Sequence, residues 1–179
     1  VILSVESRQT VQLGKLGLAE PLMNHVSNGG ALIVETWNLD EDQSSTAGFL
    51  MSLCNARVEK DWHRPEGTYN PMLFAIQARD QDSPIFNKPN RINLPIGPTV
   101  FWKGDAGDLI AVQPDGGSQI LAGLAGSNIH NYGYITSCNK GKFILQTFSS
   151  HDYPLFETVH LYQNYIDYVL TNRFNEIAD

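Results

Sequence analysis

The chain has 179 residues, enough for one domain with a well-filled hydrophobic core. Hydrophobic residues make up 42% and charged residues 17%, a balance that excludes an intrinsically disordered chain. The net charge of −7, without any run of Lys and Arg, argues against nucleic-acid binding, and no apolar stretch is long enough to span a membrane.

The first 35 residues predict a strand, a helix and a second strand. Residues 1–5 form an apolar run typical of a buried strand, and a helical pattern over residues 18–26 ends at Gly29 and Gly30. The apolar run 31–35 predicts a second buried strand, parallel to the first and central in the sheet. Because the chain opens on a strand and without Met, we expect it to be a piece of a longer protein whose upstream elements are missing.

The next hundred residues change character, because short apolar runs alternate with turn residues. An acidic loop, Asp40-Glu41-Asp42, leads to a helix that begins at Ser45 or Thr46. Irregular chain is expected at 61–70 and a turn at 104–108. The short strands predicted in this β-rich segment are 57–60, 72–78, 99–102, 109–112, 120–124 and 132–137.

The C-terminal part predicts a hairpin, another central strand and a long helix. The turn Asn139-Lys140-Gly141 makes the strand before it antiparallel to the strand at 142–150. That strand ends at His151 and Asp152. The final helix carries a strong amphipathic stripe formed by Leu155, Val159, Tyr162, Ile166, Val169 and Leu170.

Together these elements predict one α/β domain over residues 1–179. We expect a mostly parallel central sheet, helices on both of its faces, and a β-rich insertion around residues 60–138. The carboxyl ends of parallel strands are where such folds hold their ligands, so the polar residues at 35–37 and 151–152 are the candidate site.

The order of elements resembles the class I glutamine amidotransferase-like superfamily. The segment Asp82-Ser83-Pro84-Ile85-Phe86 and the stretch Gly141–Phe148 followed by His151-Asp152 are similar to its divergent branches, the ThuA-like proteins and the middle domain of some β-galactosidases. The resemblance covers most of the chain and implies a flavodoxin-like three-layer sandwich that lacks its first strand and helix. No single motif in it is specific; its weight comes from the order of elements.

The resemblance also implies where chemistry would sit. In catalytic members the strand similar to 31–35 ends in a Cys, and a His with an acidic neighbour follows the late strand. Here Glu35-Thr36-Trp37 stands at the first place and His151-Asp152 at the second. Without a thiolate the acyl-enzyme route is closed, so we do not expect amidotransferase activity.

Glu35, His151 and Asp152 are the catalytic candidates. They would form a polar pocket in which His151 acts as base or ligand and Glu35 orients it. In the simpler alternative, Asp152 caps the final helix, Pro154 lies in its first turn, and His151 bonds nearby backbone.

The ligand-binding candidates add Thr36, Trp37 and Trp102 to Glu35, His151 and Asp152. Exposed tryptophans stack on sugar rings or anchor protein interfaces, whereas buried ones fill a lid over the sheet. Trp62 and Trp102, each beside charged residues, are the better interface pair.

No metal and no cofactor are predicted. A His and several carboxylates have the right chemistry for a divalent ion, but nothing has diagnostic spacing, and no Gly-rich phosphate loop opens a helix. Cys54 falls on the apolar face of its helix, whereas Cys138 precedes a turn and is expected to be exposed. Two distant cysteines leave the compartment open.

Three functions remain as hypotheses. The first is a non-catalytic amidotransferase-like module that assembles with other subunits or domains, or with its own copies, or binds a ligand. The second is a ThuA-like protein that binds or processes a carbohydrate. The third is a residual hydrolase that uses water activated by His151.

Overall fold

The computed structural model describes residues 1–4, 17–37, 39, 45–64, 70–99, 104–113 and 117–178. Its helices and strands, in chain order, are β1 (Ile2–Ser4), α2 (Ala19–Ser27), β2 (Leu32–Glu35), α3 (Ser45–Cys54), β3 (Ala56–Arg64), β4 (Ile76–Ala78), β5 (Gly104–Val112), β6 (Gln119–Leu124), β7 (Ile135–Cys138), β8 (Phe143–Gln146) and α4 (Leu155–Ala178). Short 3₁₀ helices are η1 (Pro71–Phe74), η2 (Pro84–Phe86), η3 (Asn139–Gly141) and η4 (Ser150–Asp152).

Six strands form one mixed sheet in the order β1-β2-β8-β7-β6-β4, and β3 pairs with β5 in a separate two-stranded ribbon. The β1–β2 and β2–β8 pairs are parallel. The β8–β7, β7–β6 and β6–β4 pairs are antiparallel. The prediction of a mostly parallel, flavodoxin-like sandwich is therefore wrong.

The β-rich middle of the chain explains the difference. It was predicted to be an insertion, but β4, β6 and β7 all join the main sheet. A parallel neighbour needs a long crossover, usually a helix, and the described residues between β3 and β8 contain no α-helix. Neighbouring strands that are joined without such a crossover pair antiparallel.

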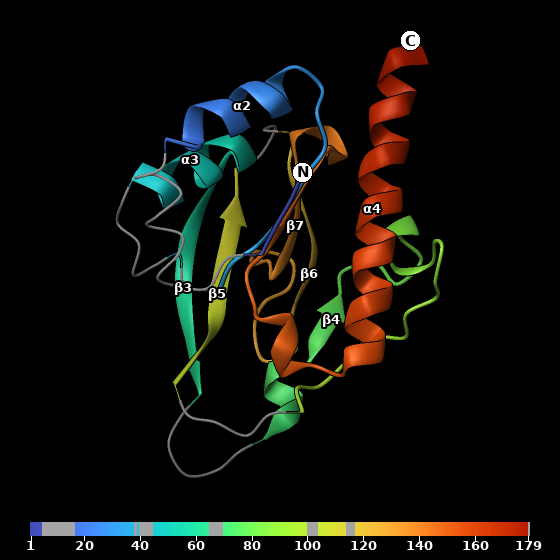
Figure 1. Cartoon of the computed structure of the whole chain (residues 1–179). Coiled ribbons are helices and arrows are strands. Elements are labelled where there is room, and N and C mark those ends of the chain that lie inside the picture. Colours follow the sequence, from blue (N-terminus) through green and yellow to red (C-terminus); the bar gives the residue numbers. More distant parts are fainter. Residues whose placement is uncertain are drawn as a thin grey trace.

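Helices lie on both faces of the sheet (Figure 1). α4 covers one face, where it contacts β2 and β8. α2, α3 and the β3–β5 ribbon lie on the other side. One apolar cluster includes Ile33, Ile144 and Tyr165 on the α4 side, and a second includes Leu32, Val34 and Leu50 on the side of α2 and α3.

Several local predictions are confirmed. The unit β1-α2-β2 is present with β1 parallel to β2, and Gly29 follows α2 with a positive φ of 82°. The turn at 139–141 joins β7 to β8 as an antiparallel hairpin. α3 turns Phe49, Leu50 and Cys54 inward.

Other local predictions are wrong. β1 is an edge strand rather than a buried one, since Val1 is 54% exposed and Ile2 53%. β2 stands second in the sheet and not at its centre. β3 continues through residues 61–64, and β5 begins at Gly104, where a turn was expected. Most of the predicted strand 99–102 lies outside the described residues.

None of the described helices combines the length and apolar character needed to cross a membrane.

Candidate functional site

The candidate site lies where β2 and β8 end side by side. Glu35, the last residue of β2, is in register with Gln146, the last residue of β8. In-register residues of neighbouring strands point to the same face of a sheet, which here is the face covered by α4. The side chains of Glu35 and Gln146 therefore both lie between the sheet and α4.

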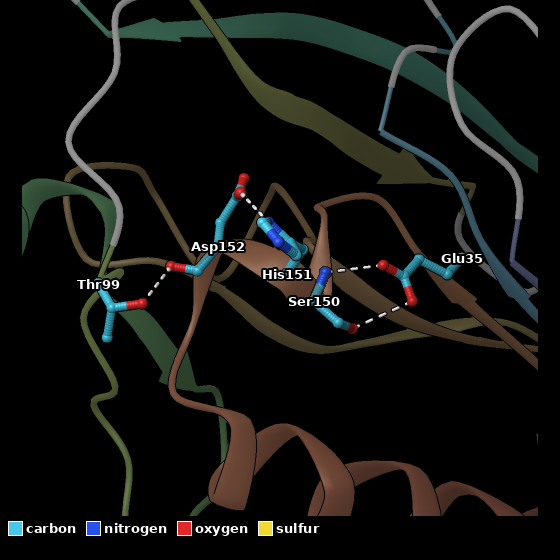
Figure 2. Close-up of polar contacts among 5 residues, drawn as sticks. All are labelled: Glu35, Thr99, Ser150, His151 and Asp152. Carbon is cyan, nitrogen blue, oxygen red and sulfur yellow. Dashed lines mark hydrogen bonds and ion pairs between the residues drawn. The ribbon is translucent and has the colours of Figure 1, made fainter.

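The carboxylate of Glu35 is fully engaged in hydrogen bonds. Oε1 accepts from the backbone N–H of Ser150 at 2.7 Å, and Oε2 accepts from the Ser150 hydroxyl at 3.0 Å (Figure 2). The hydroxyl of Tyr162 in α4 also donates to Oε2. Glu35 is 8% exposed, so these donors replace water around a buried carboxylate.

Gln146 extends this arrangement. Its Nε2 donates to Ser150 Oγ at 2.7 Å and to the Phe148 carbonyl at 3.1 Å, while its Oε1 accepts from the Tyr165 hydroxyl at 2.8 Å. We call Glu35, Gln146, Ser150, Tyr162 and Tyr165 the Glu35 network. It ties together β2, β8, η4 and α4.

The two tyrosines of the network are held protonated. Burial raises the pKa of Tyr162, and the negative charge of Glu35 and its hydrogen bond raise it further. Burial also raises the pKa of Tyr165, with smaller effects from Tyr162 and Glu35. Both hydroxyls therefore act as donors, which is the role a buried carboxylate requires.

His151 does not join Glu35. Its side chain is 91% exposed and approaches Asp152 Oδ1 at 3.9 Å, as Figure 2 shows. The Asp152 carbonyl accepts from Thr99 N at 2.7 Å and Thr99 Oγ1 at 3.3 Å. Glu35 thus contacts the residue before His151 and leaves the imidazole in solvent, where nothing orients it as a base.

The structure also differs from the simpler alternative, in which Asp152 caps the final helix and Pro154 lies in its first turn. Asp152 belongs to η4, whereas α4 begins at Leu155. The carbonyl of Pro154 accepts the first helical hydrogen bond, from Thr158 N at 3.1 Å. Pro154 therefore stands immediately before the helix instead of within its first turn.

Of the remaining ligand-binding candidates, the structure describes Thr36 and Trp37. Thr36 is fully buried, and its N–H donates to the Gln146 carbonyl at 2.9 Å. Trp37 is half-buried, and Trp102 lies outside the described residues. Trp62 packs edge-on against Phe74 with 6.2 Å between ring centroids, which is lid packing and not an open interface.

Cys54 lies in the apolar core, as predicted, but it is not a free thiol. Cys54 at the end of α3 and Cys138 at the end of β7 form a disulfide with a Cα–Cα distance of 4.6 Å. Cys138 is fully buried, not exposed. These are the only two cysteines of the chain, so no thiol remains for nucleophilic chemistry.

Among the described residues, no three His, Cys, Asp or Glu side chains cluster as metal ligands would. The acidic run 40–42 lies outside this part of the chain.

The sequence interpretation missed Gln146, Ser150, Tyr162 and Tyr165. Two signals point to them: Tyr162 and Tyr165 are three residues apart, hence on neighbouring parts of one helix face, and Gln146 ends the strand that pairs with β2. The pairing of β2 with β8 was needed to connect the two signals.

A comparison of the chain with profiles of known protein families finds no match, and a comparison with characterised proteins finds no similar sequence.

Proposed function

We propose that this chain is a non-catalytic α/β module that assembles with a second copy of itself through the outer face of α4. A row of exposed apolar side chains along that helix carries the proposal. They are Leu155 (78% exposed), Val159 (46%), Ile166 (39%) and Leu170 (38%). We call them the α4 stripe.

The α4 stripe is one continuous surface. At 100° per residue its four members fall within an arc of about 60°, on one flank of the helix. The neighbouring flank, centred about 110° around the helix from the stripe, is already buried against the sheet through Leu161, Tyr165 and Val169. An apolar row that remains exposed after the core has formed is typical of an interaction surface.

The spacing of the stripe favours a second copy as its occupant. Leu155 and Leu170 lie 7.5 positions either side of a point between Tyr162 and Gln163, and Val159 and Ile166 lie 3.5 positions either side of it. A two-fold axis through this point sets Leu155 opposite Leu170 and Val159 opposite Ile166. Self-complementary spacing of this kind is what a symmetric dimer requires.

The described candidate groups support the non-catalytic part of the proposal. Glu35 has its acceptors occupied, and both cysteines are oxidised. His151 is exposed and has only the 3.9 Å approach to Asp152. A residual hydrolase would need a base that is oriented toward a substrate, and these groups do not supply one.

We also propose amidotransferase-like ancestry for the chain. Its support is that the ends of β2 and β8 lie together, as the resemblance implies for the nucleophile and the histidine. In this chain those ends carry a closed hydrogen-bond network. A carbohydrate site built from Glu35 and Thr36 would have to open it.

The mass of the protein in solution tests the proposal. Sedimentation of the chain at micromolar concentration is expected to give twice the 19.9 kDa of one copy. Ile166→Asp is expected to give a monomer, because it places a charge in the paired stripe. Leu73→Asp is the matched control, since Leu73 is 46% exposed in η1 and away from α4. A monomeric parent chain, or equal dissociation by both variants, would contradict the proposal.

A further inference from the structure

A groove lies between the β3–β5 ribbon and the β4–β6 edge of the main sheet. Two adjoining hollows of about 490 Å³ and 440 Å³ form it, and they share Arg79, Gln119, Ile120 and His130 as lining residues. Volumes of this size suit small-molecule sites. No residue of the Glu35 network lines either hollow.

We propose that this groove binds a small organic anion that also carries hydroxyl groups, of the class of sugar acids and sugar phosphates. The proposal is independent of dimerisation, because neither hollow includes a residue of α4.

Arg79 is the anion-binding group. Its N–H donates to the Leu121 carbonyl at 2.9 Å, which extends the β4–β6 pairing and fixes where the side chain leaves the backbone. The side chain is exposed, and its guanidinium has no hydrogen bond or ion pair with any described residue. A ligand carboxylate or phosphate would supply the paired acceptors that a guanidinium fits.

The acidic residues of the groove each have a partner of their own. Glu59 pairs with Arg57 at 2.9 Å, and Asp80 Oδ1 accepts from Asp82 N at 3.0 Å. His130, whose ring is exposed, adds a second donor to the same hollows. Arg79 and His130 are therefore the donors that both hollows offer to an anion.

Neutral groups complete the groove. The side-chain amides of Gln113, Gln119 and Asn131 line the larger hollow, as does Tyr132. Amides both donate and accept hydrogen bonds, which suits ligand hydroxyls, and an aromatic ring offers a surface on which a sugar ring can stack. This mixture favours a hydroxylated anion over a bare inorganic one.

Calorimetric titration of the whole chain with four probes tests the site: glucuronate, glucose 6-phosphate, glucose and inorganic phosphate. Glucuronate or glucose 6-phosphate is expected to bind about tenfold or more tightly than glucose, as one charge-assisted pair implies. The comparison of these two shows whether the anion is a carboxylate or a phosphate. Equal affinity for glucose would overturn the role of the charge, and equal affinity for inorganic phosphate would overturn the role of the hydroxyls.

Variants of Arg79 locate the binding. Arg79→Ala is expected to weaken the better probe about tenfold or more, and Arg79→Lys, which keeps the charge but loses the fork of donors, by less. Arg91→Ala is the matched control, since Arg91 is exposed and lines neither hollow. No binding by any probe, or equal losses from Arg79→Ala and Arg91→Ala, would overturn the proposal.

Discussion

At the scale of single residues, the side chain of Glu35 joins three elements, β2, η4 and α4. Its carboxylate accepts hydrogen bonds from the Ser150 backbone, the Ser150 hydroxyl and the Tyr162 hydroxyl. A buried carboxylate with this set of donors is stabilised as an ion, whereas loss of one partner leaves an unpaired polar group. We therefore interpret Glu35 as a structural residue that fixes η4 and α4 to the sheet.

Glu35→Gln is expected to lower the free energy of unfolding by about 2–3 kcal/mol, because the amide loses the charge-assisted bonds and turns an N–H toward a donor. Urea denaturation measures the change. Combination with Tyr162→Phe in a double-mutant cycle is expected to give a coupling energy of about 1 kcal/mol. Glu20→Gln, at an exposed site in α2, is the control and should change stability by less than about 0.5 kcal/mol. Additive effects of the two changes would contradict the network.

The tyrosines of the network predict how stability depends on alkaline pH. The pKa of Tyr162 is raised above its ordinary value of 10.0, so the folded chain keeps this proton where the unfolded chain has lost it. The stabilisation is present in full below about pH 10 and is lost as pH rises above it, with a slope of at most about 1.4 kcal/mol per pH unit for each such group. Tyr162→Phe should therefore flatten this decline in urea unfolding series. Parallel curves for both chains would exclude the effect.

At the scale of elements, the disulfide joins α3 to the main sheet within one apolar cluster. Cys54 ends α3 and Cys138 ends β7, 84 residues later in the sequence. A disulfide that closes a loop of this length restricts the conformations of the unfolded chain. Such bonds are typical of proteins in oxidising compartments.

Removal of this bond is expected to be costly. The double variant Cys54→Ala/Cys138→Ala should lose about 4.5 kcal/mol of unfolding free energy, the chain-entropy value for a loop of this length. Urea denaturation of the parent under oxidising conditions gives the reference, and reduced parent protein should resemble the variant. A loss below about 1 kcal/mol would mean that the bond does not restrain the unfolded chain.

The elements that local sequence predicts well are those with strong end signals. Gly29 ends α2 where φ turns positive, and the turn at 139–141 makes the β7–β8 hairpin. The β3–β5 ribbon was harder to predict, because Gly104 and Gly107 in β5 are residues typical of turns. Its strands form because they pair with each other over nine residues each, and that long-range pairing has no local signal.

The orientation of α4 could not be predicted from its apolar pattern. Its buried face includes Thr158 and Asn164, which a hydrophobic pattern assigns to solvent. Asn164 is buried because its amide donates to the Ile85 carbonyl at 2.9 Å and the Asn90 carbonyl at 2.7 Å. These partners come from the η2 region, so only the tertiary structure shows which side of the helix remains free.

Strand pairing brings together the two segments that the sequence singled out, and Glu35 contacts Ser150 there instead of His151. Parallel pairing of β2 with β8 brings Glu35 beside the segment that carries His151, as strand ends in such sheets do. The hydrogen-bond partners of Glu35 come from η4 and from Tyr162 in α4. Nothing in the sequence around Glu35 indicates either partner.

At the scale of the whole molecule, α4 has one side packed against the core and another side exposed. Its inner flank seals the Glu35 network, and its outer flank leaves the α4 stripe exposed. The groove at Arg79 lies at another part of the molecule, lined by β3, β4, β5 and β6 and their loops. Assembly and ligand binding are therefore separable by mutation, since each has its own residues.

Disulfide trapping across the stripe tests the central claim, that α4 pairs antiparallel with α4 of a second copy. Val159→Cys and Ile166→Cys are made as separate proteins, in which the native cysteines are already paired. In the proposed dimer these two positions face each other, whereas two copies of either one lie about 10 Å apart along the helices, too far for a disulfide. The account predicts a cross-linked dimer when the two proteins are mixed and oxidised, and little when either is oxidised alone. Cross-linking by one variant alone, or none in the mixture, would contradict it.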